Sequence, residues 1–382
     1  MVRNIYYLCP CSEAPCGGVQ KIYQHVDVLN QNGFNAYVLH PKKGFRYSWR
    51  ENKTKLAYYE PNFWTWLGIQ GGRNLAIRIL RRWSKKGAFR SQVVPLSRFT
   101  KNICVLGDNY QKIRLPKLNQ QDVIVFNDYI VPALTTMIGK FPSVILNFTA
   151  YTTFHGITIG ESLGRASSLP YDERSLGCIV GSKDTEDYLR FVFPKLTYYG
   201  CPFGVDTEQF VFHGAKERKV AFMPRKCPDH LVQILSILRQ RNKFPNWSFV
   251  ALEKMSQERL IGELKTSALF LSTSYLEGLG LPPAEALSCG ALVVGYDGEG
   301  GKEFFHPPFA HSIAHGNIIG FVKKIEEMMA FFESDQKQFI QIGKIGSDFI
   351  ASKYSIAREN RSIVKAWSQI AAAKTELEKT NR

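Results

Sequence analysis

The stretch Ser274-Tyr-Leu-Glu277-Gly-Leu-Gly-Leu-Pro-Pro-Ala-Glu285-Ala-Leu-Ser-Cys-Gly290 places two carboxylates eight positions apart around a glycine-containing loop. The apolar run at 268–272 just before it predicts a buried strand. Pro282-Pro283 is typical of a first helical turn, since neither residue needs a hydrogen-bonding partner for a backbone N–H there. This strand–loop–helix unit indicates an α/β domain, with Glu277 in the loop and Glu285 in the first turn of the helix.

The backbone between the two glutamates predicts an anion site. We expect free N–H groups from Gly278, Leu279, Gly280 and Leu281 to lie at the positive end of the helix dipole. Carboxylates on either side accept hydrogen bonds from hydroxyl groups. A ligand that combines an anion with hydroxyls, such as a nucleotide sugar, fits this arrangement.

Length and composition indicate an ordinary globular protein. The 382 residues are enough for two domains, and 45% of them are hydrophobic. No apolar run approaches the roughly 18 residues of a transmembrane helix, and the first ten residues lack the features of a signal peptide. The eight cysteines form no CxxC pair, so we expect reduced thiols in a cytoplasmic protein. Cys9, Cys11 and Cys16 have no histidine at ligand spacing, and we expect no metal there.

The charge is strongly basic and unevenly distributed. Lys and Arg number 49 against 33 Asp and Glu, a net charge of +16. Residues 61–107 contain no acidic residue, whereas basic side chains and three tryptophans recur along them. Such a segment is typical of contact with an anionic membrane surface. The alternatives are a solvated insertion that aids solubility or, with no motif in its favour, nucleic-acid binding.

Short apolar strands alternate with helical patterns in the first half, which predicts a parallel sheet covered by helices on both faces. The expected elements are strands at 5–8, 36–39, 123–126, 144–148 and 178–180, with a helix at 19–29. The carboxyl ends of parallel strands are where open α/β sheets bind ligands. Four polar residues at such ends are therefore acceptor-site candidates: Asn127, Asp128, Tyr151 and His155.

The pattern restarts after a change in composition near residue 206. Further strands are expected at 220–223, 248–252, 268–272 and 291–295, and the chain reads as helical from Ile318 onward. We therefore expect one domain at 1–206, a second at 207–355, and a final helix at 356–382 that packs back on the first domain. The basic insertion, at about 61–107, belongs to the first domain.

Several motifs in the same order resemble the GT-B glycosyltransferases of the family-4 type, over nearly the whole chain. They are Gly17-Gly18, Gly204-Val205-Asp206, Arg225, Glu277-x7-Glu285, Cys289-Gly290 and Gly300-Gly301. The resemblance implies two facing Rossmann-like domains with parallel sheets. It also implies a retaining transferase, with the acceptor on the N-terminal domain and the nucleotide-sugar donor on the C-terminal domain.

The resemblance assigns roles to particular residues. Glu285 would bind the ribose and Glu277 the donor sugar, while Arg225 would bind the phosphates. Gly17 and Gly18 would approach the donor closely because they carry no side chain. His155 is the candidate for the family's acceptor-side histidine. The family's lysine after the arginine is replaced here by His230, so either Lys226 takes over or the phosphates rely on Arg225 and backbone amides.

The chemistry of leaving-group stabilisation separates two mechanisms. No Asp-x-Asp motif occurs in the sequence, so we expect no catalytic metal and no other cofactor. Arg225, Lys226 and the helix N-terminus at 282–284 would stabilise the leaving phosphates instead. Glu277 either binds sugar hydroxyls or acts as a nucleophile, as in retaining glycosidases. We favour front-face transfer without a covalent intermediate.

The prediction is a retaining, metal-independent enzyme. It would transfer a hexose from a nucleotide sugar, UDP-glucose or UDP-galactose, to a glycan or lipid-linked glycan in polysaccharide biosynthesis. It would work in the cytoplasm, with residues 61–107 resting on the inner face of the plasma membrane and no nucleic-acid partner. The alternatives are a nucleotide-sugar epimerase or hydrolase, or an inactive sugar-binding GT-B subunit.

Overall fold

The computed structural model describes residues 2–11, 16–40, 44–47, 52–58, 118–128, 141–154, 171 and 175–380. All structural statements below concern these residues. The segment 61–107 and His155 lie outside them.

The first part of the chain forms a seven-stranded sheet in the order β3-β2-β1-β4-β5-β6-β7, and each neighbouring pair is parallel. Its strands are β1 (Ile5–Leu8), β2 (Ala36–His40), β3 (Leu56–Tyr58), β4 (Val123–Asn127), β5 (Ser143–Asn147), β6 (Ser175–Val180) and β7 (Tyr198–Gly200). The five predicted strands are present, because each is a short apolar run that is buried in the sheet. The sequence had not indicated the short strands β3 and β7.

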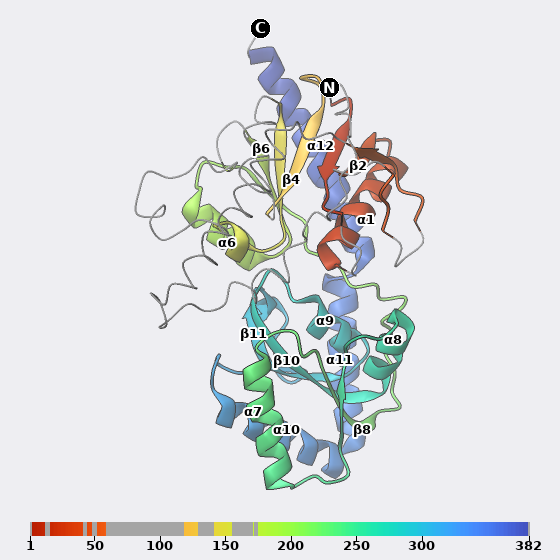
Figure 1. Ribbon diagram of the computed structural model, residues 1–382, viewed down its shortest axis with the longest axis vertical. Helices are drawn as coiled ribbons and strands as arrows, with labels where there is room; N and C mark the ends of the chain where they lie inside the picture. Colours follow the sequence, from red (N-terminus) through yellow and green to blue (C-terminus); the bar gives the residue numbers. More distant parts are fainter. Residues whose placement is uncertain are drawn as a thin grey trace, which may run out of the picture.

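Helices complete this N-terminal domain. They are α1 (Gly17–Gln31), the 3-10 turn η1 (Ala150–Thr152), α6 (Lys183–Val192) and α12 (Ile356–Thr380). The Ser182 side chain caps α6 by accepting a hydrogen bond from the Thr185 N–H. Helix α12 packs against α1, β6 and β7, as Figure 1 shows for the dark blue helix at the top of the molecule. The prediction that the final helix returns to the N-terminal domain is confirmed.

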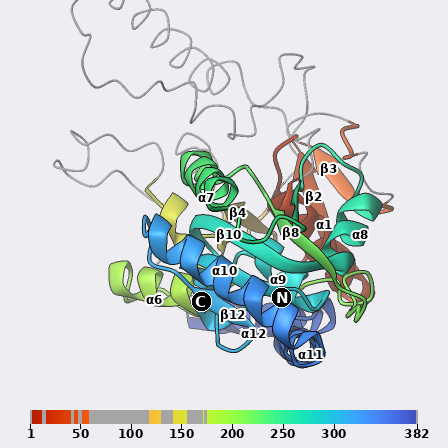
Figure 2. The same cartoon turned by 90° about the horizontal axis from the view of Figure 1, so that it is seen from below.

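The second part forms a five-stranded parallel sheet in the order β12-β11-β10-β8-β9. Its strands are β8 (Glu217–Phe222), β9 (Ser248–Ala251), β10 (Ser267–Glu277), β11 (Leu292–Glu299) and β12 (Ala310–Ser312). The helices are α7 (Pro228–Arg241), α8 (Gln257–Thr266), α9 (Leu281–Ser288), the 3-10 turn η2 (Gly300–Glu303), α10 (Ile318–Ser334) and α11 (Gln336–Lys353). Helices α7 and α10 pack together on one face (Figures 1 and 2), and α8, α9 and α11 pack on the other.

The chain crosses between the two sheets at one place. Val205 donates its N–H to the Tyr354 carbonyl at 2.6 Å, and Ile356 donates to the Val205 carbonyl at 3.0 Å. The outgoing and returning segments therefore run side by side. Our proposed domain limits, after residues 206 and 355, both fall at this crossing.

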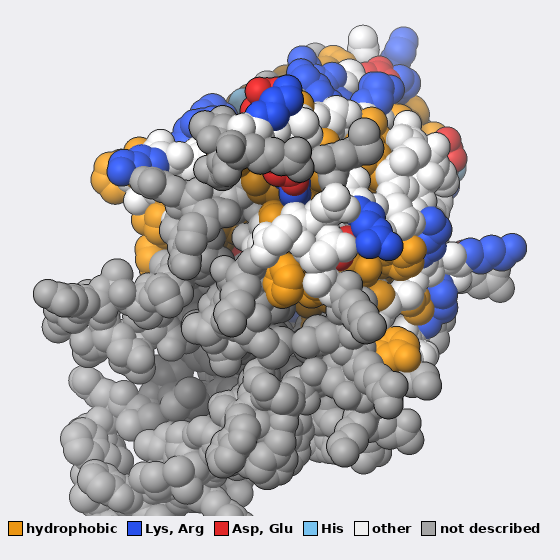
Figure 3. All heavy atoms as spheres, turned by 90° about the horizontal axis from the view of Figure 1, so that it is seen from above, with side chains coloured by type: hydrophobic (Ala, Val, Ile, Leu, Met, Phe, Trp, Pro, Cys, Tyr) orange, Lys and Arg blue, Asp and Glu red, His pale blue; other side chains and the backbone are white. Residues whose placement is uncertain are grey.

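In the part of the chain that the structure describes, no helix combines the length and the apolar character that a membrane crossing requires. The end of the molecule seen in Figure 3 carries Lys and Arg side chains at several separated points among apolar ones.

Candidate donor and acceptor sites

Strand β10 and helix α9 position the two glutamates at one edge of the C-terminal sheet. Strand β10 continues to Glu277, five residues beyond the predicted run, because it stays paired with β11 up to Glu299. Helix α9 begins at Leu281 after Gly280, whose φ of 83° suits glycine. Glu285 is the fifth residue of α9, so the prediction that it lies in the first turn was wrong. It lies in the second turn.

The N-terminus of α9 offers fewer backbone N–H donors than the sequence predicts. Pro282 and Pro283 are in the first turn of α9, as predicted, but proline has no N–H. Among the first four residues of the helix, only Leu281 and Ala284 carry one. An anion at 282–284 would thus meet little more than the Ala284 N–H, and side-chain cations become more important.

Two cations approach the glutamates. The Lys226 ammonium lies 2.9 Å from a Glu277 carboxylate oxygen, and both side chains remain partly exposed. Arg225 is exposed at the end of β8, within electrostatic range of Glu285. Strand β8 and strand β10 are neighbours in the sheet, so their carboxyl ends bring the predicted residues together. Donor-site candidates from 225–226 and 277–285 therefore form one cluster.

Glu285 is poised between protonation states. Burial raises its pKa to about 7, against the opposing charges of Lys21 and Arg225. No side chain in the described ranges donates a hydrogen bond to this carboxyl group. Its oxygens are therefore available to hydrogen-bond donors from a ligand or from solvent.

Gly278 lies where the C-terminal domain contacts the N-terminal domain. A Cβ atom at this position would overlap the carbonyl oxygen of Phe148, which follows β5 in the N-terminal domain. On the other side, the Gly278 carbonyl leaves no room for a side chain at Gly300. Gly278 thus allows the loop after β10 to touch the backbone of the opposite domain.

Gly17 and Gly18, the glycine pair predicted to lie near the donor, are also close to this contact between the domains. Gly17 and Gly18 are the first two residues of α1. A Cβ at Gly18 would lie 3.4 Å from the Phe148 ring, whereas none of the described residues lies within 4 Å of a Cβ at Gly17. Gly17 therefore has open space beside it, which suits a residue that a donor approaches closely.

Asp128 lies at the end of β4 in the N-terminal domain. One carboxylate oxygen accepts hydrogen bonds from the Thr149 N–H at 3.2 Å and from the Thr152 hydroxyl. The other oxygen is buried and has no partner among the residues described. Burial raises the pKa of Asp128 to about 7, although both hydrogen bonds favour the carboxylate. A carboxyl group with this pKa can accept a proton near neutral pH.

Tyr151 and Asn127 both have hydrogen-bond partners within the protein. The Tyr151 hydroxyl donates to Asp184 at 3.0 Å, and burial raises the pKa of both groups. Asn127 is buried and donates to the Leu8 carbonyl at 3.1 Å, which ties the ends of β4 and β1 together. Asp128 therefore remains the better acceptor-site candidate, because one of its carboxylate oxygens has no partner among the residues described.

Lys21, a buried cation on α1, was not predicted from the sequence. Its ammonium contacts Glu359 of α12 and the Gly204 carbonyl, the latter at 2.7 Å. Burial alone would raise the pKa of Glu359, but Lys21 and the hydrogen bond from His25 hold it at about 2. Because 338 residues separate Lys21 from Glu359, no local pattern could reveal the pair.

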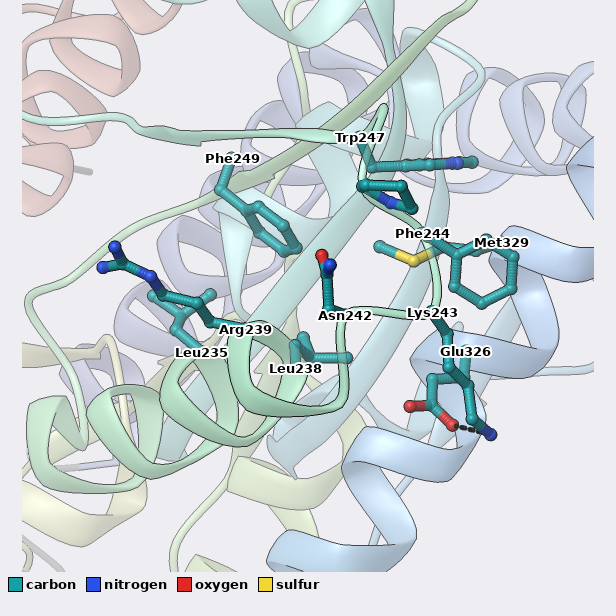
Figure 4. A pocket seen from close by; sticks show the side chains of 11 residues that line it. Leu235, Leu238, Arg239, Asn242, Lys243, Phe244, Trp247, Phe249, Glu326 and Met329 are labelled. Carbon is teal, nitrogen blue, oxygen red and sulfur yellow. Dashed lines mark hydrogen bonds and ion pairs between the residues drawn. The ribbon is translucent and has the colours of Figure 1, made fainter.

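The one pocket outlined in Figure 4 lies away from this cluster. It has a volume of about 320 Å³, and Trp247 and Phe249 line it at the start of β9. Because the strands are parallel, this is the opposite end of the sheet from Glu277. Its lining includes Lys243, which is paired with Glu326 at 3.0 Å (Figure 4). We assign it no part in the site.

Comparisons with known proteins agree with this arrangement. Residues 248–344, which include both glutamates, match the family described as glycosyl transferases group 1. A search of curated proteins gave no significant match.

Solved structures resemble the chain over nearly its full length. Sucrose-phosphate synthase from Thermosynechococcus elongatus has a TM-score of 0.63 at 13% identity, covering 97% of this chain and 100% of that one. HepE from Anabaena with UDP-glucose has a TM-score of 0.60 at 11% identity, covering 96% and 99%. A TarM mutant from S. aureus with fondaparinux, α-GlcNAc-glycerol and UDP has a TM-score of 0.61 at 11% identity, covering 97% and 100%.

The predicted fold class and enzyme class are thereby confirmed. The two parallel sheets match the fold of these neighbours, and the family match falls on the part of the chain that carries the glutamate pair. The chain has the two-domain fold of these glycosyltransferase structures, and residues 248–344 of its C-terminal domain match the glycosyl transferases group 1 family.

Proposed function

We propose that this enzyme transfers a hexose from a UDP-sugar to a glycan or lipid-linked glycan, with retention and without a catalytic metal. The observation that carries the proposal is the cluster of Arg225 and Lys226 with Glu277 and Glu285 at the carboxyl edge of the C-terminal sheet. Cations beside two carboxylates suit a diphosphate linked to sugars on both sides. The UDP-glucose of HepE and the UDP of TarM support the choice of nucleotide.

Each residue has a proposed task. Arg225 and Lys226 bind the diphosphate, and Lys226 leaves Glu277 when the donor enters. Glu277 then binds hydroxyls of the donor sugar, and Glu285 binds the ribose. The N–H groups from Gly278 to Leu281 complete the donor site. On the other domain, Asp128 and Tyr151 bind the acceptor, and His155 is a further candidate from outside the described residues.

The reaction needs charge stabilisation more than a strong base. The bond between the anomeric carbon and the β-phosphate oxygen breaks, and the acceptor oxygen bonds to the same face of that carbon. The acceptor proton passes to the leaving phosphate, whose negative charge Arg225 and Lys226 stabilise. Removing one such donor costs roughly 3–4 kcal/mol in the transition state. Glu277 as a nucleophile is the alternative step.

The test measures nucleotide release and sugar transfer from UDP-, GDP- and ADP-sugars, with a chelator present. We expect turnover with a UDP-hexose, and a loss of roughly 100- to 1,000-fold in Arg225→Ala. The matched control is Arg239→Ala, an exposed arginine on α7, which should keep full activity. Failure of every nucleotide sugar to bind would overturn the proposal, and release without any acceptor would favour the epimerase or hydrolase reading.

Glu277 can be tested separately. Glu277→Gln keeps a hydroxyl-binding side chain but cannot form a covalent glycosyl ester. Residual transfer with retention supports the hydroxyl-binding role, whereas a glycosyl adduct on wild-type Glu277 in mass spectrometry would show the nucleophile. Glu258→Gln, an exposed carboxylate on α8, is the control.

We also propose that residues 61–107 rest on an anionic membrane surface, since they are basic, contain tryptophan and lack acidic side chains. Sedimentation with vesicles tests this. Binding to vesicles with anionic lipid, lost at high salt, is expected. Equal recovery with neutral and anionic vesicles would favour the solvated insertion.

A further inference from the structure

Three metal-ligating side chains converge beside the donor-binding segment. Cys227 directly follows Lys226 and is the N-cap of α7, His230 is in the first turn of α7, and His315 lies between β12 and α10. One potential ligand atom from each residue lies within 4.8 Å of the others. It is the one such group of His, Cys, Asp or Glu in the described part of the chain.

The distances suit a shared ion. The Cys227 Sγ atom is 3.7 Å from the His315 Nε2 atom. Zinc binds sulfur at about 2.3 Å and nitrogen at about 2.0–2.1 Å, so tetrahedral ligation separates the two atoms by about 3.6 Å. The geometry is thus close to what one ion would impose.

The surroundings orient the two imidazoles. The His230 Nδ1 atom is 3.0 Å from the Tyr296 hydroxyl, which leaves Nε2 available to an ion. The His315 ring packs beside the rings of Tyr275 and Tyr296, with centroids 4.7 and 4.9 Å away. Metal-bound histidines commonly hold their second ring nitrogen in such a hydrogen bond. Tyr296 therefore has the place of an outer partner.

Cys227 also has an unusual position for a helix N-cap. Its φ is 41°, and its side chain makes no capping hydrogen bond. The thiol is directed towards His315 instead. The side chain is thus available as a ligand at a position where serine or aspartate would usually bond to the helix.

We propose that Cys227, His230 and His315 bind one transition-metal ion of the zinc class. One sulfur and two nitrogen donors suit such a borderline ion and do not suit Mg²⁺ or Ca²⁺, which prefer oxygen. Cys227 binds as the thiolate and releases its proton to solvent. Water fills the fourth position, since His315 is exposed. The ion joins the segment of Arg225 and Lys226 to the loop before α10, and takes no part in bond breaking.

The test is a titration of the metal-free full-length protein with Co²⁺, followed by competition with Zn²⁺. We expect thiolate-to-cobalt charge-transfer absorption at a stoichiometry of one ion, abolished by zinc. Cys227→Ser should lose this absorption, and His315→Ala should weaken binding at least 10-fold. His306→Ala, which removes another exposed histidine, should bind as the wild type does.

The proposal is overturned by the absence of charge-transfer absorption in the wild type or by the same absorption in Cys227→Ser. Unchanged affinity in His315→Ala would also reject the three-residue site. Tyr296→Phe keeps all three ligands and should lower affinity by roughly 10- to 100-fold. Far-ultraviolet circular dichroism of each variant shows that the fold is retained. The readout is independent of sugar transfer, so it stands apart from the outcome of the activity assays.

Discussion

The two domains contribute carboxylates of opposite surroundings to the place where they meet. In the C-terminal domain, Glu277 faces Lys226, and Glu285 lies near Arg225. In the N-terminal domain, Asp128 accepts hydrogen bonds from Thr149 and Thr152. Our proposal assigns the first, the donor edge, to a charged diphosphate and the second, the acceptor edge, to a polyol. The difference between them is that cations approach only the carboxylates of the donor edge among the contacts described.

The largest effect is expected at the buried ion pair between Lys21 of α1 and Glu359 of α12, which lies in the N-terminal domain. Lys21→Met leaves the buried Glu359 without its ammonium partner, which typically costs about 3–5 kcal/mol of unfolding free energy. Folding lowers the pKa of Glu359 from 4.5 to about 2, so the ionised group stabilises the folded protein above pH 4.5. This stabilisation disappears as the pH falls towards 2, and Lys21→Met should remove it. Urea unfolding at pH 7 and pH 3 measures it.

The control for this variant is Lys183→Met, which breaks the exposed pair with Asp187. That change should cost less than about 1 kcal/mol. A Lys21→Met protein as stable as the control at pH 7 would show that the buried pair does not hold α12 to the N-terminal domain.

A second variant pushes the two edges apart. Gly278→Ala places a methyl group against the Phe148 carbonyl oxygen, so the loop or the opposite domain must move. A displacement of about 1 Å near a reacting centre can lower the rate by roughly 100-fold. The transfer rate should fall by this factor while the melting temperature changes little.

Gly262→Ala is the matched glycine control, since nothing lies within 4 Å of its Cβ in helix α8. It should keep full activity and gain up to about 1 kcal/mol of stability. Full activity in Gly278→Ala would mean that the contact with Phe148 does not set the geometry of transfer.

A further prediction concerns the pH dependence of the two carboxyl groups. Both Glu285 and Asp128 have pKa values of about 7, so kcat/KM should fall as the pH decreases below 7, roughly tenfold per unit for each group that must be ionised. Glu285→Gln should remove the pH dependence of kcat/KM for the donor. Asp128→Asn should remove the dependence that appears with the acceptor. The measurement is kcat/KM for the donor and for the acceptor, each determined at pH values from about 5.5 to about 8.5, which bracket the pKa of about 7.

Asp128 also affects stability in a predictable direction. Its pKa is raised on folding, so the folded protein loses stability as the pH rises from about 4 to 7. Asp128→Asn should therefore be more stable than the wild type at pH 8, by a few kcal/mol at most, since each pKa unit corresponds to about 1.4 kcal/mol. Equal stability at pH 8 would contradict a buried carboxylate at this position.

The donor edge could be predicted because it is local in sequence. Glu277 and Glu285 belong to one strand–loop–helix unit, and Arg225 follows a neighbouring strand. The errors there were of detail: β10 is longer than its apolar run, and Glu285 falls one turn later in α9. Hydrophobic pattern locates a strand, but pairing with its neighbour determines where it ends.

The acceptor edge could be predicted only in part, because separate strands supply it. The position of Asp128 at a strand end was evident, whereas its partners Thr149 and Thr152 come from a different loop. Asn127 has the same type of position, yet its amide is used by Leu8. Whether a polar side chain is available to a ligand depends on contacts that sequence spacing does not contain.

Helix α12 has a consequence for the order in which the protein is made. Trp367 is fully buried and donates a hydrogen bond to the Tyr7 hydroxyl at 2.7 Å, across 360 residues. The N-terminal domain leaves the ribosome first, but α12 follows only after the whole C-terminal domain. One face of the nascent N-terminal domain therefore stays exposed until α12 has been synthesised. The N-terminal domain therefore begins synthesis first but is completed last. Until then, the surface of α1, β6 and β7 that α12 later covers is accessible to a chaperone.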